Sequence, residues 1–302
     1  MKLNQLKLFL NEFGDNVKFE YDLKKKNWFN IGGKAKIFYK ANNLNELIIF
    51  LKKLDNKEKI FVLGAGSNIL ISDNLFDGVV IQLGKNFNNI SLLGEDIIVA
   101  GSSVLDKSLS EFAMSNSLSG FEFLSCIPGT IGGGIKMNAG CFGNEFKDIL
   151  LSVQAIDKAG NVKTILSKDI RFEYRDNNLS DDLIFLSASF KGINGNSVKI
   201  NDEMCRLKIE KEKNQPSKIK TSGSTFKNPT LQTKKKVWEL IKDCIPLDTN
   251  FGDAHISDKH CNFFVNKGNA TFDDMIKLIN FVTENVFNKT GIKLEKEIKI
   301  LE

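Results

Sequence analysis

Val62-Leu63-Gly64-Ala65-Gly66-Ser67-Asn68 places two glycines, a hydroxyl and an amide directly after the apolar run Ile60–Leu63. A short apolar run that ends in a turn signal predicts a buried strand. The turn can offer bare backbone amides and a hydroxyl to phosphate oxygens. A Rossmann dinucleotide fingerprint requires a glycine where this chain has Ile69, so that type of nicotinamide site is disfavoured. An ordinary glycine-rich turn is the alternative for this segment alone.

A second glycine cluster follows at Ile127-Pro128-Gly129-Thr130-Ile131-Gly132-Gly133-Gly134. Glycine loses more conformational freedom on folding than any other residue, so the cluster indicates close approach of the backbone to a ligand or to a neighbouring helix. Two such loops favour an extended cofactor that carries phosphate. A glycine-lined site of helix packing is the alternative, and it explains one loop more readily than both.

Helical and strand patterns alternate around these loops, which predicts an α+β fold. Leu44–Leu54 carries one apolar helical face, and Thr271 forms a capping pair with Asp274 at the start of a last long helix that stops before Gly291. A polar stretch at Gly192–Ser197 marks a domain boundary. The other expected elements are strands at 60–63, 79–83, 152–156, 162–165 and 183–190, and helices at 105–117 and 203–213.

The charge and the composition narrow the function classes. The net charge is +5 and the lysines are dispersed, so the runs at 24–26 and 234–236 predict solvated faces and no nucleic-acid partner. No apolar stretch is long enough to span a bilayer, and residues 1–5 lead into an amphipathic segment, so we expect a cytoplasmic protein with no membrane partner. The five cysteines form no CxxC pair and the two histidines give no metal-ligand spacing, which predicts reduced thiols and no metal.

Arginine is rare in this chain. Of 42 basic residues, only Arg171, Arg175 and Arg206 are arginine. Arginine supplies a planar fork that binds a carboxylate or a phosphate through two hydrogen bonds, and lysine cannot. Each arginine is therefore a candidate for that kind of contact.

A polar loop at Ser222-Gly223-Ser224-Thr225-Phe226-Lys227-Asn228-Pro229 gathers hydroxyls, an ammonium and an amide around one tight bend. Gly223 allows a positive φ or a close approach to a ligand, and Pro229 stiffens the exit. Groups of this kind suit proton transfer and anion binding. An ordinary polar turn is the alternative on composition alone.

Seven segments, in this order along nearly the whole chain, resemble the UDP-N-acetylenolpyruvoylglucosamine reductase (MurB) family. The loop at Ser224 and the pair Tyr174-Arg175 are the most specific of them. The chain is similar to the shorter form of the family, which lacks an extra tyrosine-bearing loop. The segments are Trp28–Ala35, Leu63–Asp73, Phe123–Gly143, Tyr174–Asp176, the loop at Ser224, Ser257–Asn266 and Leu294–Ile298.

This resemblance implies a vanillyl-alcohol-oxidase-like FAD-binding fold. Residues 1–85 and 86–197 would form two FAD-binding subdomains, and residues 198–302 a C-terminal α/β substrate domain. The cofactor would be noncovalent FAD, and the cosubstrate NADPH. The enzyme would reduce the enolpyruvyl group of UDP-N-acetylenolpyruvoylglucosamine to give UDP-N-acetylmuramate for peptidoglycan and cell wall synthesis. A monomer is expected.

The resemblance also implies a role for individual residues. Ser224 would donate a proton, Arg175 would hold the substrate carboxylate, and Glu297 would be the acidic catalytic partner. Tyr174, Lys227 and Asn228 would contact the substrate. The FAD contacts would be Gly64, Ala65, Gly66, Ser67 and Asn68 in the first glycine loop and Pro128, Gly129, Thr130 and Gly133 in the second.

Several alternatives stay open for these residues. Arg175 could be a structural ion-pair partner of Asp176 or Glu173, and Glu295 shares the strand alternation of Glu297. His255 and His260 are the only histidines, and His260, in the segment Ser257–Asn266, fits packing or hydrogen bonding better than a role as a base. Two rival functions stay open: another FAD enzyme of the same fold, such as an oxidase, and a non-catalytic protein that binds a nucleotide-sugar or FAD. Oxidases with covalent flavin commonly use a histidine in the FAD domain, and this chain has none before residue 255.

The chain departs from the family pattern at a few positions. Asn30 and Lys34 stand where arginine and proline are expected, and Lys299 stands where arginine is common. Glu212-Lys213 replaces an expected arginine pair. No phosphate contact is carried over to Glu212, because a carboxylate repels phosphate.

Overall fold

The computed structural model describes residues 12–55, 57–216 and 219–302. Residues 1–5 therefore lie outside the described residues. The described chain divides into two compact units. Unit 1 holds the described residues up to Phe19 together with Lys36–Ala65 and Asp77–Glu210, and unit 2 holds the described residues of Glu20–Ala35, Gly66–Phe76 and Lys211–Glu302.

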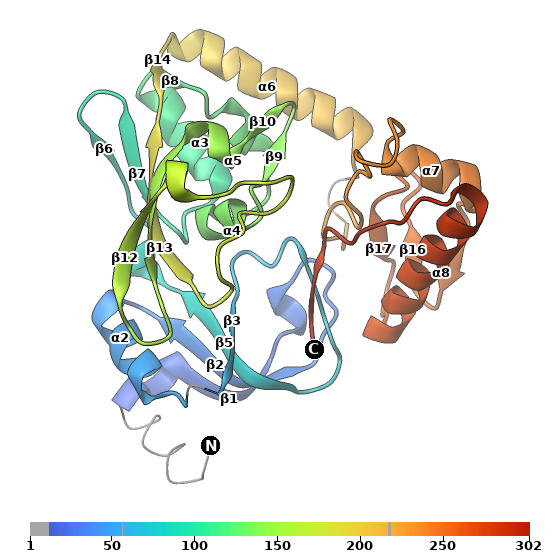
Figure 1. Ribbon diagram of the computed structural model, residues 1–302, viewed down its shortest axis with the longest axis horizontal. Helices are drawn as coiled ribbons and strands as arrows, with labels where there is room; N and C mark the ends of the chain where they lie inside the picture. Colours follow the sequence, from blue (N-terminus) through green and yellow to red (C-terminus); the bar gives the residue numbers. More distant parts are fainter. Residues whose placement is uncertain (1–11, 56, 217–218) are drawn as a thin grey trace. The chain divides into compact units, whose positions relative to one another are not determined.

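Two sheets form the framework of unit 1 (Figure 1). In the four-stranded sheet, β3 and β5 run parallel, with Phe61 opposite Val80. The five-stranded sheet is antiparallel throughout. In spatial order, the first sheet is β1 (Val17–Asp22), β2 (Lys34–Ala41), β5 (Phe76–Leu83) and β3 (Lys59–Val62), and the second is β12 (Val162–Leu166), β11 (Leu150–Ile156), β13 (Ile184–Lys191), β7 (Ile97–Gly101) and β6 (Ile90–Leu93).

Short helices and turns connect and cover these sheets. α2 packs on the four-stranded sheet through Phe50, whose ring stacks on Tyr39 with centroids 3.8 Å apart. The helices are α2 (Leu44–Lys53), α3 (Asp106–Ser115), α4 (Ile131–Lys136) and α5 (Phe146–Ile149). The short 3-10 turns and strands are η1 (Gly14–Asn16), η3 (Lys85–Phe87), η4 (Glu122–Cys126), η5 (Ser167–Asp169), β8 (Leu118–Ser119), β9 (Gly140–Cys141), β10 (Asn144–Glu145) and β14 (Ile193–Asn194).

Two hydrophobic clusters fill unit 1. One lies under α2 and contains Ile37, Val79 and Ile81. The other contains Phe123, Phe146 and Phe190 from α5, η4 and the five-stranded sheet. Each fully buried aromatic or aliphatic side chain of this kind stabilises the fold by about 1.5–3 kcal/mol relative to an exposed position. The second cluster supports α4, the helix that continues the second glycine loop.

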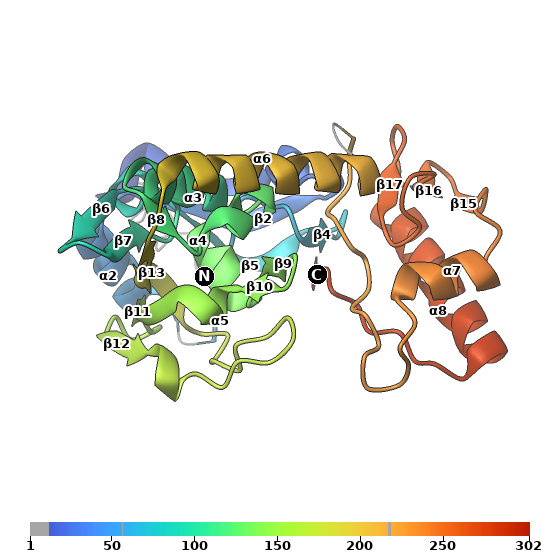
Figure 2. The same ribbon diagram turned by 90° about the horizontal axis from the view of Figure 1, so that it is seen from above.

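Unit 2 is a small α/β unit in which α8 packs beside α7 and the hairpin strands (Figure 2). Met275, Ile279 and Val282 of α8 lie at 0–2% exposure in its core. β18 pairs in parallel with β4, so the end of the chain is bound to the segment that follows the first glycine loop. The elements are η2 (Lys24–Lys26), β4 (Ile69–Ile71), α7 (Val237–Cys244), β15 (Asn250–Phe251), β16 (Ala254–Ile256), β17 (Phe264–Asn266), α8 (Phe272–Thr290) and β18 (Lys299–Leu301).

Most of the predicted elements are confirmed, and the best-predicted boundary is that of α8. Thr271 Oγ1 accepts the Asp274 N–H at 3.1 Å, Asp274 accepts the Thr271 N–H at 2.9 Å, and Gly291 closes the helix at φ +73°. α6 (Ser197–Asn214) begins six residues before the predicted 203, because Asn196 Oδ1 accepts the N–H groups of the first turn.

The polar stretch before this helix therefore contains its cap. The division at residues 85 and 197 stays a prediction. None of the helices in the described ranges combines the length and the apolar character that crossing a membrane requires.

Candidate active site

The two glycine loops meet in unit 1. A Cβ on Gly64 would lie 2.6 Å from Thr130 Oγ1, which only a glycine permits. The first loop is anchored where the Leu63 N–H donates to Ile81 O at 2.8 Å. The structure thus brings together the predicted residues Gly64 and Thr130, which lie far apart in the sequence.

The glycines of α4 separate into packed and open positions. A Cβ on Gly134 would lie 2.3 Å from the Phe146 ring, and one on Gly132 would lie 3.0 Å from Ser102 Cβ. Gly133 is exposed, and a Cβ there would meet only Thr130 Oγ1 at 3.6 Å. Helix packing therefore explains two of these glycines, and Gly133 is the one that faces open space beside Thr130.

The backbone amides of this loop are partly engaged within the protein. The Ile131 N–H donates to Val104 O and the Gly132 N–H to Ser102 O, both at 2.9 Å. These two amides are therefore not the donors of a phosphate cradle. The expected cradle is limited to the part of the loop that includes Gly129, Thr130 and Gly133.

Asp106 lies directly behind the second glycine loop, at the start of α3. Its N–H donates to Gly129 O at 3.2 Å, and a Cβ on Gly129 would lie 2.6 Å from its Oδ2. The side chain is fully buried, and neither carboxyl oxygen has a hydrogen-bond partner among the described residues. Burial raises the pKa of Asp106 well above its ordinary value, so the neutral acid is favoured.

The Ser224 loop lies in unit 2 and is held by Asn262. The Thr225 N–H donates to Asn262 O at 2.7 Å, and the Phe226 N–H donates to Asn262 Oδ1 at 3.0 Å. Asn262 Nδ2 in turn donates to Phe226 O at 2.9 Å. Gly223 has φ +80°, which creates the bend before Ser224. Ser224 itself is half-buried. The hydrogen bonds of Asn262 to the next two residues fix the backbone that carries the Ser224 hydroxyl.

Glu297 is attached to the same loop. Its N–H donates to Thr225 O at 2.8 Å, and Asn68 Nδ2 donates to its carbonyl oxygen at 3.2 Å. Asn68, predicted to contact FAD, thus positions the Glu297 backbone in this structure. Glu297 is half-buried, whereas the side chain of Glu295 is 75% exposed and lies 3.9 Å from Lys227 Nζ.

Two more of the predicted site residues, one in the first glycine loop and one in the Ser224 loop, have structural roles. Gly66 has φ +68°, and a Cβ there would lie 2.1 Å from Lys26 O, so the position requires glycine. Asn228 Oδ1 accepts the Val237 N–H at 3.0 Å and so caps α7. The substrate roles of Asn228 and Lys227 stay predictions, as do the FAD contacts of Ala65, Ser67 and Pro128.

Arg175 lies in unit 1, in the loop that joins η5 to β13. Its Nη2 donates to Gly140 O at 2.9 Å, and its Cζ lies 5.0 Å from the centroid of the Tyr174 ring. Glu173 accepts from Arg171 Nε at 3.3 Å. Arg175 has φ +60°, a conformation that a non-glycine residue adopts only when its surroundings impose it.

Arg206 and His260 have structural contacts. Arg206 forms a fork with Glu203 on α6, with both distances 2.7 Å. The His260 ring packs edge-on against Phe263, and its Nδ1 accepts the Asn262 N–H at 3.3 Å. Burial lowers the pKa of His260, which keeps it neutral. These contacts agree with the prediction that His260 packs and hydrogen-bonds.

Sequence reasoning assigned no role to three buried asparagines that hold the site. Asn262 binds the backbone of the Ser224 loop. Asn138 and Asn177, both at 0% exposure, connect the Arg175 loop to α4 and the residues after it: Asn138 donates to Glu173 O, and Asn177 donates to Ile135 O. Asn138 has φ +39° and lies four residues after the second glycine loop, in the run Met137-Asn138-Ala139-Gly140. A polar residue inside a glycine-rich run was the only available signal.

The residues of unit 1 fit a bound FAD. Gly133 leaves open space, Gly64 removes a side chain at the point where the loops meet, and Thr130 provides a hydroxyl between them. A flat ligand with a diphosphate needs close approach of this kind to backbone and hydroxyl groups. The described residues contain no group of three or more His, Cys, Asp or Glu that could hold a metal ion.

Comparison with known proteins decides the family. The model for the C-terminal domain of UDP-N-acetylenolpyruvoylglucosamine reductase matches residues 215–301, and that for an FAD binding domain matches residues 35–166. The UDP-N-acetylenolpyruvoylglucosamine reductase of Pelagibacter ubique (strain HTCC1062) is 64% identical over 302 residues, the full length of both chains. The chain belongs to the UDP-N-acetylenolpyruvoylglucosamine reductase (MurB) family.

Further relatives of this MurB chain agree. The UDP-N-acetylenolpyruvoylglucosamine reductase of Rickettsia bellii (strain RML369-C) is 48% identical over 280 residues, which cover 93% of this chain and 92% of the relative. The crystal structure of the MurB enzyme from Thermus caldophilus superimposes with a TM-score of 0.81 at 28% identity and covers 95% of this chain and 98% of its own. The predicted family, α+β FAD-binding fold, oxidoreductase class and FAD cofactor are confirmed.

Adjacent glycines in α4 should respond differently to the same substitution. Gly134→Ala forces a Cβ into the Phe146 ring, so the free energy of unfolding should fall by about 1–3 kcal/mol, as is typical of overpacking, and the melting temperature should fall with it. Gly133→Ala meets open space, so the apoprotein should fold normally while FAD binds more weakly. Thermal melting and flavin content after gel filtration measure both effects. If Gly133→Ala keeps a full complement of FAD, Gly133 does not face the cofactor.

Asp106→Asn should change how stability depends on pH. Because the folded pKa is raised above the unfolded value of about 3.9, the folded state keeps a proton that the unfolded state loses. Stability of the wild type should therefore fall as pH rises above about 3.9 towards the folded pKa, and the isosteric Asn variant should remove this fall. Asp77→Asn is the control: the Lys36 hydrogen bond lowers the pKa of Asp77, so it is ionised across this range. Equal slopes for wild type and Asp106→Asn would show that Asp106 is ionised in the fold.

Proposed function

We propose that this chain catalyses the NADPH-dependent reduction of UDP-N-acetylenolpyruvoylglucosamine to UDP-N-acetylmuramate, a step in peptidoglycan precursor synthesis. The observation that carries the proposal is the joint placement of Ser224 and Glu297 on paired backbone segments of a chain that matches MurB relatives over its full length. A nucleotide-sugar binder without chemistry would not need a hydroxyl and a carboxylate on one rigid support.

The loops around Gly64 and Thr130 would hold FAD through backbone and hydroxyl contacts. Bound FAD would supply the hydride-transfer chemistry between NADPH and the methylene carbon of the enolpyruvyl group. The protein's part is to place the substrate, stabilise charge and deliver a proton. The substrate residues would include Tyr174, with Lys227 and Asn228 of the Ser224 loop.

Charge develops on the substrate once the methylene carbon has gained a hydride. The electron pair of the double bond then lies on the adjacent carbon and is delocalised as an enolate of the carboxylate. Arg175 would bind that carboxylate through its fork and stabilise the enolate. Ser224 Oγ–H would deliver the proton to the adjacent carbon, because a carbanion is basic enough to accept from a hydroxyl. Glu297 would be the acidic partner that supports this transfer.

The proposal also includes the oligomeric state, the location, the cosubstrate and the division into domains. The enzyme would act as a monomer in the cytoplasm and would use NADPH. Its FAD subdomains would be residues 1–85 and 86–197, with residues 198–302 as the substrate domain. Glu212 would make no phosphate contact, and its backbone oxygen accepts from Lys259 Nζ.

Ser224→Ala should slow only the step in which substrate is reduced. General acid catalysis is typically worth about 10²–10⁴-fold, so flavin reoxidation by the UDP-sugar should slow by that order while flavin reduction by NADPH stays unchanged. Stopped-flow absorbance separates the two half-reactions. The control is Ser222→Ala, whose buried hydroxyl donates to Ile69 O at 3.1 Å and should affect stability instead. Slower flavin reduction by NADPH with normal reoxidation by the UDP-sugar would show that Ser224 does not deliver the proton to the substrate.

The two glutamates near the C-terminus give a second test. Glu297→Gln should lower the rate of flavin reoxidation strongly, because an amide on the segment paired with the Ser224 loop cannot act as an acid as the carboxyl would. Glu295→Gln should be nearly silent, because its side chain is 75% exposed. Single-turnover rates on FAD-loaded protein compare them. Equal effects of the two variants, or a larger effect of Glu295→Gln, would contradict the assignment.

A further inference from the structure

The Arg175 loop is fastened to the end of α4 by side chains from both partners. Asn177 Nδ2 donates to Ile135 O at 3.1 Å, and Asn138 Nδ2 donates to Glu173 O at 3.1 Å. Both asparagines are fully buried. The start of the loop is therefore bound to the two residues that flank the end of this helix.

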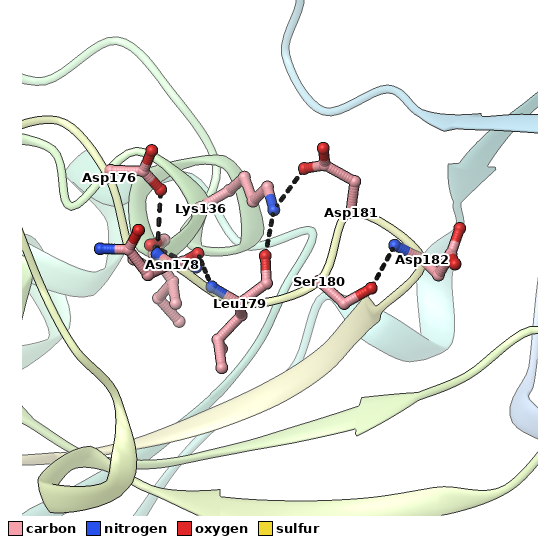
Figure 3. A network of polar contacts seen from close by, with 9 residues as sticks. Lys136, Asp176, Asn178, Leu179, Ser180, Asp181 and Asp182 are labelled. Carbon is pink, nitrogen blue, oxygen red and sulfur yellow. Dashed lines mark hydrogen bonds and ion pairs between the residues drawn. The ribbon is translucent and has the colours of Figure 1, made fainter.

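Lys136, the last residue of α4, holds the far side of the loop (Figure 3). Its Nζ donates to Leu179 O at 3.1 Å and lies 2.7 Å from Asp181 Oδ1. The side chain is 28% exposed. Figure 3 shows the ammonium between these two oxygens, with the remaining dashed contacts running within the loop itself. Lys136 thus links a segment expected to carry FAD to a segment expected to bind substrate.

The backbone between these contacts is strained in a way that the contacts explain. Arg175 and Asn178 have φ +60° and +50°. The Asn178 N–H donates to Asp176 Oδ1 at 2.9 Å, and the Leu179 N–H donates to Asn177 Oδ1 at 3.0 Å. Such conformations persist only where surrounding contacts fix them. Release of one attachment would therefore allow the loop to relax and Arg175 to move.

We propose that Lys136 is a positioning residue for Arg175: by binding Leu179 O it keeps the arginine loop in the conformation that receives the substrate carboxylate. The inference rests on the proposed function of Arg175. The bond to the carbonyl carries the effect, because the Asp181 side chain is 94% exposed and an ion pair with so exposed a group contributes little. On this proposal Lys136 acts on the substrate side, so its loss should leave FAD binding unchanged.

Lys136→Met removes the ammonium and keeps most of the apolar stem. Loss of one charge-assisted hydrogen bond that orders the loop should raise the KM for the UDP-sugar about tenfold. Flavin content and the rate of flavin reduction by NADPH should stay at the wild-type values. Lys136→Arg should restore most of the affinity, and Asp181→Asn should be close to wild type. Lys158→Met is the matched control, because Lys158 is 31% exposed and pairs with Asp182 at 2.6 Å.

A second readout needs no substrate. Trypsin cleaves after arginine, so mass spectrometry can follow cleavage after Arg175 in the FAD-bound protein. Lys136→Met should accelerate this cleavage, and Lys158→Met should not. Equal cleavage rates and equal KM values in Lys136→Met and wild type would overturn the inference, as would an equal rise in both lysine variants. Failure of the wild type to reduce the UDP-sugar would instead refute the proposed function, and the cleavage rates would still decide the role of Lys136.

Discussion

Buried asparagine amides are the constraint on which the site depends. The loops at Arg175 and Ser224 are irregular, so they lack a ladder to satisfy their backbone groups, and a buried backbone group without a partner costs free energy. Asn138, Asn177 and Asn262 supply those partners, and each is at most 3% exposed. An asparagine side chain carries a donor and an acceptor like a peptide group, so it can complete a hydrogen-bond pattern that the backbone leaves open.

Asparagine side chains bind irregular backbone in both units, and the residues held in each unit are proposed to have different chemical roles. In unit 1, α4 is held from behind by Phe146, and its end carries the asparagine and lysine contacts that fix the arginine loop. In unit 2, Asn262 and Asn68 hold the backbones on either side of the Ser224 and Glu297 pair. The residues proposed to do chemistry are thereby mounted on fixed backbone, which is what preorganised charge stabilisation requires.

The sequence predicted elements that local rules specify. α8 was readable from its capping pair and its C-terminal Gly291, and the glycine loops were readable as points of close approach. The sequence could not separate Gly134, which packs on Phe146, from the open Gly133, because that difference depends on a contact across the fold. The Asp106 carboxyl, which has no hydrogen-bond partner among the described residues, and the hydrogen bonds of Asn262 gave no local signal for the same reason. Their roles follow from tertiary burial.

Amide hydrogen exchange of the FAD-bound protein, read by mass spectrometry or NMR, tests most directly whether these asparagines fix the catalytic loops. The account predicts that the amides of Thr225, Phe226 and Glu297 exchange about as slowly as those of β13, although they lie outside any extended sheet. The exposed turn around Asn161 provides the fast reference. If the amides of the Ser224 loop exchanged as fast as those of that turn, the account would be contradicted, because the hydrogen bonds of Asn262 would then not stabilise the loop against opening.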